Sequence, residues 1–293
     1  MGGAERGGGW QFWVDRGGTF TDVVARRPDG RLLTHKLLSE DPRRYEDAAV
    51  AGIEALLAGG GGGGGGDVGQ DTAAVDHTAV DVIRMGTTVA TNALLERAGE
   101  PTALVVTRGF GDALRIGYQD RPRIFDRHIV LPDQLYARVV EVDERVTAQG
   151  EVLREPDLDR VAADLERVRQ DGVGAVAVVC LHSHLYPEHE RRIGALARRL
   201  GFGQVSLSSE VSPLMKLVPR GDTTVVDAYL SPVLRRYVRG VAGRLGGVRL
   251  MFMQSNGGLP RPGTSGARTR SCPARRAASS GWRGCPGPRA TTG

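Results

Sequence analysis

Apolar and polar residues alternate along the start of the chain and then take up helical spacing. Residues 12–37 predict three strands, the second and third joined by Pro28-Asp29-Gly30, a tripeptide typical of turns between strands. Apolar residues at helical spacing predict a helix over 43–58. The eight glycines 59–66 that follow predict a flexible surface loop.

Strands and helices alternate from residue 80 onward, which indicates an α/β layered fold. The apolar runs predict strands at 80–85, 103–107, 175–181, 204–207 and 248–253. The periodic segments between them predict helices at 87–97, 157–171, 187–200 and 219–245.

Composition excludes several classes of protein. The 293 residues, 40% of them hydrophobic, suffice for one large domain or two ordinary ones. No stretch approaches the ~20 apolar residues that span a bilayer, and the N-terminus lacks the apolar segment of a secretory signal. The three cysteines have neither disulfide nor metal spacing. We expect a soluble protein of the cytoplasm (cytosol).

The net charge of +5 is misleading as a sign of nucleic-acid binding. Residues 260–293 hold seven arginines and no Asp or Glu, which leaves 32 basic residues against 34 acidic ones elsewhere. The basic excess is therefore confined to this tail, and a folded basic patch for nucleic acid is not indicated.

The segment Asp15-Arg16-Gly17-Gly18-Thr19-Phe20-Thr21-Asp22 is the first candidate site. It places two carboxylates, two threonine hydroxyls and adjacent glycines at a turn between strands. Glycines let backbone N–H groups approach an anion, hydroxyls add donors, and Asp15 could hold a hydrated Mg²⁺. These features favour a phosphate-binding hairpin, and the alternative is an ordinary glycine-containing turn.

Two further strand ends are candidates for the cleft or substrate loop. In the first, Gly86 permits a turn, Thr87 can cap the next helix, and the helix start can face an anion. The second follows the strand at 248–253, where ligands of open α/β sheets bind. The candidate residues are Gly86, Thr87, Thr88 and Asn92 in the first loop and Ser255, Asn256, Gly257 and Gly258 in the second.

Weaker candidates lie in the middle of the chain. Glu144 could serve as a general base and Arg145 as a clamp, but such alternation is also typical of the polar face of a strand. The histidines of His182-Ser183-His184, with His189, lack the spacing of a metal site. Arg220 could reach a ligand carboxylate, or its segment could simply begin a helix.

Several motifs together resemble the N-terminal part of ATP-dependent 5-oxoprolinases, within the hydantoinase/oxoprolinase family. The resemblance runs in order from about residue 12 to 259. Its motifs include VDRGGTFTDV (14–23), KLLSEDP (36–42), IRMGTTVATNALLER (83–97), VVEVDERV (139–146), VPRGDTTVVDAYLSP (218–232) and FMQSNGG (252–258). KLLSEDP and VVEVDERV are closer to oxoprolinases than to hydantoinases.

The resemblance implies an actin-like, sugar-kinase-like ATPase fold, of which this chain holds the first lobe and the start of the next. It implies ATP-dependent hydrolysis of the lactam of 5-oxo-L-proline to L-glutamate, with ATP and Mg²⁺ required. It also implies a role in glutathione metabolism, in the cytosol, with a homo-oligomer formed through regions partly missing here. The alternatives are an ATP-dependent hydantoinase and a non-catalytic nucleotide-binding fragment.

Carried over by position, Asp15, Gly17, Gly18, Thr19 and Thr21 match the family's first phosphate loop, and Asp15 its Mg²⁺-water partner. Gly86, Thr87, Thr88 and Asn92 match a second loop that lines the cleft. Arg145 is placed near the substrate by position alone.

The same reasoning divides the chain into four parts. We expect a flexible N-terminus (1–11), the family's N-terminal domain (12–215), the start of its second domain (216–259) and a disordered basic tail (260–293). Codons that can encode residues 271–281 read VLSGPAGGVVG when shifted by one base, a segment similar to the family's continuation. The hypothesis is a frameshifted tail and a product of little activity; the alternative is a genuine basic tail.

Overall fold

The computed structural model describes residues 8–59, 77–118, 125, 127–128 and 133–253. They form two compact units, and the second interrupts the first: unit 1 holds the chain up to Glu96 and again from Val233, and unit 2 runs from Arg97 to Pro232. Arg97 has a φ of 57°, a left-handed conformation that follows the end of α2 (Val89–Leu95). The return to unit 1 falls within α7 (Leu217–Arg244), beside Pro232.

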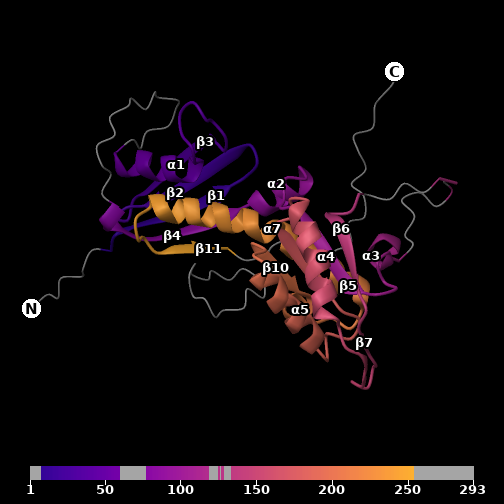
Figure 1. Ribbon diagram of the computed structural model, residues 1–293. Helices are drawn as coiled ribbons and strands as arrows, with labels where there is room; N and C mark the ends of the chain where they lie inside the picture. Colours follow the sequence, from indigo (N-terminus) through magenta and orange to yellow (C-terminus); the bar gives the residue numbers. More distant parts are fainter. Residues whose placement is uncertain (1–7, 60–76, 119–124, 126, 129–132, 254–293) are drawn as a thin grey trace, which may run out of the picture. The chain divides into compact units, whose positions relative to one another are not determined.

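Unit 1 is built on a five-stranded sheet in the order β11-β4-β1-β2-β3 (Figure 1). β1, β2 and β3 form an antiparallel meander, and β4 and β11 lie parallel to β1. The strands are β1 (Trp10–Arg16), β2 (Phe20–Arg26), β3 (Leu32–Leu38), β4 (Val80–Thr87) and β11 (Leu250–Phe252). The 3-10 turn η1 (His77–Ala79) precedes β4.

One face of this sheet is buried and the other carries polar and exposed side chains. Phe12 and Val14 of β1 pack in a core that includes Ile53 of α1 (Ala48–Leu57) and Val241 of α7. Alternate residues point to opposite faces of a strand, so Asp15 lies on the other face and is exposed. The buried face fixes the register, and the register in turn fixes which polar residues share the exposed face.

Unit 2 contains a parallel four-stranded sheet in the order β10-β9-β5-β6 (Figure 1). Its strands are β5 (Thr102–Thr107), β6 (Tyr136–Val142), β9 (Ala175–Val179) and β10 (Gln204–Leu207). A small hairpin, β7 (Arg145–Val146) with β8 (Val152–Arg154), follows β6. The helices are α3 (Ala113–Ile116), α4 (Leu158–Gln170), α5 (Glu188–Arg199), α6 (Ser208–Val211) and the first part of α7.

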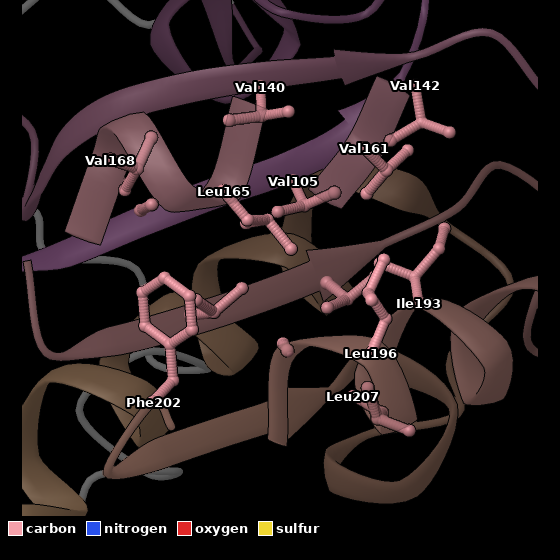
Figure 2. Packing of buried hydrophobic residues seen from close by; sticks show 14 of the residues in the cluster. Val105, Val140, Val142, Val161, Leu165, Val168, Ile193, Leu196, Phe202 and Leu207 are labelled. Atoms are coloured by element: carbon pink, nitrogen blue, oxygen red, sulfur yellow. The ribbon is translucent and has the colours of Figure 1, made fainter. Parts of the chain in front are cut away.

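Helices cover both faces of the sheet in unit 2, which explains why β5 and β9 are buried along their whole length. Figure 2 shows side chains of α4 and α5, among them Leu165 and Ile193, meeting Val105 and Val140 of the strands. On the opposite face Val225 and Ala228 of α7 belong to a second cluster.

Most predicted elements are present, with shifted ends. The helix predicted from 43 begins at Ala48, because the Asp47 carboxylate accepts hydrogen bonds from the Ala49 and Val50 N–H groups and caps it there. The helix predicted over 87–97 spans Val89–Leu95, and the strand predicted to 181 ends at Val179. The strand β6 and the short elements η1, α3, α6, β7 and β8 were not predicted. Of the glycine run 59–66, all but the first residue lie outside the described residues.

Candidate functional site

The β1–β2 hairpin forms the tip on which the first candidate site lies. Asp15 pairs with Asp22, Arg16 pairs with Thr21, and the Gly17 N–H donates to the Phe20 carbonyl at 3.0 Å. A Cβ on Gly17 would stand 3.0 Å from that carbonyl oxygen, so glycine is the residue that allows so tight a turn.

The carbonyl groups of this tip are held from neighbouring strands. The Arg16 carbonyl accepts hydrogen bonds from the N–H and the hydroxyl of Thr88, both at 3.1 Å. Ser39 donates its hydroxyl to the Gly17 carbonyl at 2.7 Å and its N–H to the Thr19 carbonyl at 2.9 Å. The Arg16, Gly17 and Thr19 carbonyls are therefore already used within unit 1.

Two backbone donors of the tip, unlike these carbonyls, have no partner among the described residues. Within the part of the chain that the structure describes, neither the Gly18 nor the Thr19 backbone N–H has a hydrogen-bond acceptor, and both residues are exposed. Successive N–H groups left free at a glycine turn form a concave surface of positive potential that suits an anion. The tip thus offers two adjacent donors to a ligand.

A row of four residues crosses the exposed face of the sheet next to this tip. Gly86, Asp15, Asp22 and Lys36 face one another on β4, β1, β2 and β3 in turn. The Lys36 Nζ lies 2.9 Å from Asp22 Oδ1 and neutralises that carboxylate. Among the described residues, no side chain pairs with or donates to the Asp15 carboxylate. Since two facing carboxylates repel, Asp15 is the member of the row that a cation would stabilise.

The second predicted loop lies against the first. A Cβ on Gly86 would stand 3.3 Å from Asp15 Oδ1, and one on Gly18 would stand 3.2 Å from Asn92 Nδ2. Thr87 pairs with Arg16 across β4 and β1. The two segments, 71 residues or so apart in sequence, therefore lie side by side within unit 1.

Three threonines of these two segments have defined partners, and Thr21 differs from expectation. Thr21 is fully buried, and its hydroxyl lies 3.0 Å from the Ser39 hydroxyl, so this side chain positions the hairpin and cannot meet a ligand. The N-cap of α2 is Thr88 and not Thr87, and the Thr88 hydroxyl is turned to Arg16 instead of to the helix. The Thr87 hydroxyl accepts a hydrogen bond from the Val89 N–H.

The third predicted loop, Ser255 to Gly258, lies outside the described residues. It follows β11, which runs parallel to β4 in the same sheet. Its place in the site stays a prediction.

Glu144 is not placed to act as a general base, which corrects that expectation, while the placement of Arg145 near the substrate stays a prediction. Glu144 is almost fully buried in unit 2, where it accepts a hydrogen bond from the Thr107 hydroxyl and lies 2.7 Å from His189 Nδ1. Arg145 donates to the Arg108 carbonyl at 3.2 Å. Both carboxylate oxygens of Glu144 are occupied by protein groups, so this carboxylate serves the packing of unit 2.

Arg220 is likewise a structural residue and does not reach a ligand. Its side chain is fully buried and donates to the Cys180 carbonyl at 2.5 Å and to the Ser208 hydroxyl at 2.9 Å. It also donates to His184 Nδ1 at 3.2 Å, and burial together with this guanidinium lowers the pKa of His184. Among the described residues, no group of three or more His, Cys, Asp or Glu side chains is arranged to hold a metal ion.

One carboxylate of unit 2 is electrostatically unusual. Burial raises the pKa of Asp222, in the first turns of α7, to about 6. Asp222 in turn contributes to the raised pKa of Tyr136, after burial and Asp112. This environment could not be predicted from the sequence, because it depends on packing against distant segments.

Comparisons with known proteins place these features in context. The profile described as "Hydantoinase/oxoprolinase N-terminal region" matches residues 11–201, and that described as "Hydantoinase/oxoprolinase" matches 220–285. The chain is 45% identical over 275 residues to "5-oxoprolinase 1" of Arabidopsis thaliana, an alignment that covers 85% of this chain and 21% of that protein. The chain therefore spans about a fifth of the length of this relative.

Two solved structures are similar to the chain. The ATP-dependent caprolactamase from Pseudomonas jessenii matches with a TM-score of 0.70 and 29% identity, over 85% of this chain and 36% of that one. The nucleotide-free structure of acetone carboxylase matches with a TM-score of 0.67 and 22% identity, over 86% and 37%, and shows the fold alone.

Fold and site together define the class: an α/β chain of the actin-like ATPase type, with a glycine-turn hairpin at the end of its first strand. Within that class, the chain belongs to the hydantoinase/oxoprolinase family. Among the residues described, no helix is both long and apolar enough to cross a membrane.

Proposed function

We propose that unit 1 binds the phosphate groups of ATP at the β1–β2 hairpin. The observation that carries the proposal is the asymmetry of the tip: the Arg16, Gly17 and Thr19 carbonyls are held by protein groups, while the Gly18 and Thr19 N–H groups have no acceptor among the described residues. Family relatives described as ATP-dependent support ATP as the anion.

Asp15 is the residue that we propose for Mg²⁺. Mg²⁺ keeps several waters and binds through one or two carboxylates together with substrate phosphates, so a single exposed carboxylate beside a phosphate site fits it. Asp15 meets that condition, and Gly86 leaves the space beside its Oδ1 open. When bound, the ion would offset negative charge on the transferring phosphoryl group. Asp22 is already neutralised by Lys36, so we assign it no metal.

For the complete protein we propose hydrolysis of the lactam of 5-oxo-L-proline to L-glutamate, coupled to hydrolysis of ATP to ADP and phosphate. The relative at 45% identity is named a 5-oxoprolinase, and the caprolactamase is also named for a cyclic amide. A lactam carbonyl is a poor electrophile, because its nitrogen donates electron density into it. Transfer of the γ-phosphoryl group to the carbonyl oxygen would make the ring carbon electrophilic enough for water to add. The ring C–N bond would then break, with a proton going to the nitrogen, and a second water would hydrolyse the resulting acyl phosphate to L-glutamate and phosphate. We further propose a cytosolic place in glutathione metabolism.

The phosphate site can be tested on the chain itself. Titration calorimetry with MgATP is expected to show binding that Asp15→Asn weakens by at least tenfold. The matched control is Asp29→Asn, which changes another exposed carboxylate, in the β2–β3 turn, where Asp29 accepts a hydrogen bond from the Arg31 N–H. Equal losses in both variants, or no binding by the unaltered chain, would contradict the proposal.

The substrate proposal needs the regions that the relatives possess and this chain does not span. In a chimera, residues 8–253 replace the matched part of the Arabidopsis relative, and ADP formation is measured with 5-oxoproline or with N-methylhydantoin. We expect 5-oxoproline to be the better substrate. We expect little turnover by the 293-residue chain alone, because one set of phosphate donors cannot preorganise the transition state. A preference for N-methylhydantoin would refute the assignment.

A further inference from the structure

We propose that Ser39 is a positioning residue, which holds the Gly17–Thr19 loop in the shape that presents its two free N–H groups to phosphate. This inference rests on the proposed phosphate site. Ser39 directly follows β3 and belongs to the KLLSEDP segment.

Every polar group of Ser39 faces the hairpin. Its hydroxyl proton goes to the Gly17 carbonyl at 2.7 Å, so the Thr21 hydroxyl, 3.0 Å away, must donate to the Ser39 oxygen. The Ser39 N–H donates to the Thr19 carbonyl, and the Ser39 carbonyl accepts a hydrogen bond from Arg16 Nη2 at 3.4 Å. Ser39 is only 4% exposed, so water cannot readily replace these bonds.

The two contacts with loop carbonyls determine which way the loop faces. Because Ser39 donates hydrogen bonds to the Gly17 and Thr19 carbonyls, both carbonyls point toward the C-terminal end of β3. The peptide units of the loop are planar, so fixing a carbonyl also fixes the N–H of the following residue. The Gly17 carbonyl belongs to the same peptide unit as the Gly18 N–H, one of the two proposed phosphate donors.

Arg16 extends this support to α1 and α7. Its Nη1 lies 3.3 Å from Asp47 Oδ2, while Asp47 Oδ1 caps α1. Its guanidinium lies over the Tyr237 ring, 4.9 Å from the centroid. Burial, followed by Asp47, raises the pKa of Tyr237 to about 12, so the phenol stays neutral beside this arginine. The loop is thus anchored through Ser39 to a helix cap and a ring of the buried face.

Unit 2 offers a matched control serine. Ser206 is 2% exposed, donates its hydroxyl to Asp227 at 2.7 Å and accepts a hydrogen bond from Gln204 at 2.8 Å. It resembles Ser39 in burial and in the number of hydroxyl contacts, but its partners lie in unit 2. Ser206→Ala therefore reproduces the loss of a buried hydroxyl without touching the hairpin.

The experiment compares Ser39→Ala and Ser206→Ala with the unaltered 293-residue chain, after thermal unfolding shows which variants are folded. NMR amide exchange is measured without ligand at Gly17 and at residue 39, whose N–H groups bond to Phe20 and Thr19. We expect exchange at least about tenfold faster in Ser39→Ala and unchanged in Ser206→Ala. Calorimetry is expected to show MgATP affinity reduced about tenfold in Ser39→Ala alone.

Each of the other possible results would overturn one part of the reasoning. Unchanged exchange at these two amides in folded Ser39→Ala overturns the positioning role. Faster exchange with unaltered MgATP affinity overturns its connection with phosphate. Absence of MgATP binding in the unaltered chain overturns the proposed function instead, and the exchange measurement then still decides whether Ser39 holds the loop.

Discussion

Replacement of Gly86 by alanine separates the stability of unit 1 from ligand binding. Gly86 lies opposite Asp15 on the exposed face of the sheet, and a Cβ there would stand 3.3 Å from Asp15 Oδ1 and 3.9 Å from its Cγ. The new methyl group would occupy the space beside the carboxylate that we propose for the waters of Mg²⁺. It would not enter the core.

The expected magnitudes differ between the two properties. The 3.3 Å contact requires a movement of a few tenths of an ångström by an exposed side chain, while loss of glycine from a strand stabilises by roughly 0.5–1 kcal/mol. The free energy of unfolding should therefore change by less than about 1 kcal/mol. Loss of one hydrogen bond to a charged group costs about 1.5–3 kcal/mol, which is roughly a 10- to 150-fold loss of MgATP affinity.

The assay pairs thermal unfolding with calorimetric titration of MgATP. Gly240→Ala is the control, because a Cβ on Gly240 of α7 meets nothing within 4 Å. Gly240→Ala should leave the affinity unchanged. An affinity of Gly86→Ala equal to that of the unaltered chain, in a folded protein, would refute the placement of the ligand beside Asp15.

Three further substitutions test other parts of the structure. Asp222→Asn should raise the free energy of unfolding at pH 7 by about 1–3 kcal/mol. A carboxyl whose pKa is raised to about 6 stabilises the fold below its ordinary pKa and loses that contribution as pH rises through 6. Thermal unfolding from pH 4 to 8 should therefore depend less on pH in the variant. Glu144→Ala should destabilise unit 2 by about 3–5 kcal/mol by breaking a buried pair with His189, and MgATP titration of the folded variant below its melting temperature should give unchanged affinity. Gly52→Ala should cost about 1–3 kcal/mol in thermal unfolding, because its Cβ would stand 2.7 Å from Val23 Cγ2 in the core.

The hairpin could be predicted because its chemistry is local. Asp15, Gly17 and Gly18 lie within four residues, and their order after an apolar strand already indicates the turn. The inward position of Thr21 could also have been predicted, because Val23 and Ala25, at alternate positions of the same strand, are apolar and buried.

The rest of the site could not be predicted, because it depends on contacts between distant segments. Ser39 reaches Gly17 across 22 residues, and no local pattern distinguishes a serine after a strand that holds a loop from one that meets water. The charged neighbours of Glu144 made it a candidate general base, yet its partner His189 lies 45 residues further along the chain. In both cases tertiary contacts decide the role.

The interruption of unit 1 by unit 2 has a consequence for biosynthesis. β11 pairs with β4, but more than 160 residues separate Thr87 from Leu250, and nearly all of unit 2 lies between them. At about 5–20 residues per second, the ribosome needs roughly 10–30 s to deliver that strand. Unit 2 is contiguous from Arg97 to Pro232 and can fold as it emerges, whereas β4 waits with one edge unpaired. β11, the last strand of the described residues, thus completes the sheet that the first strands began.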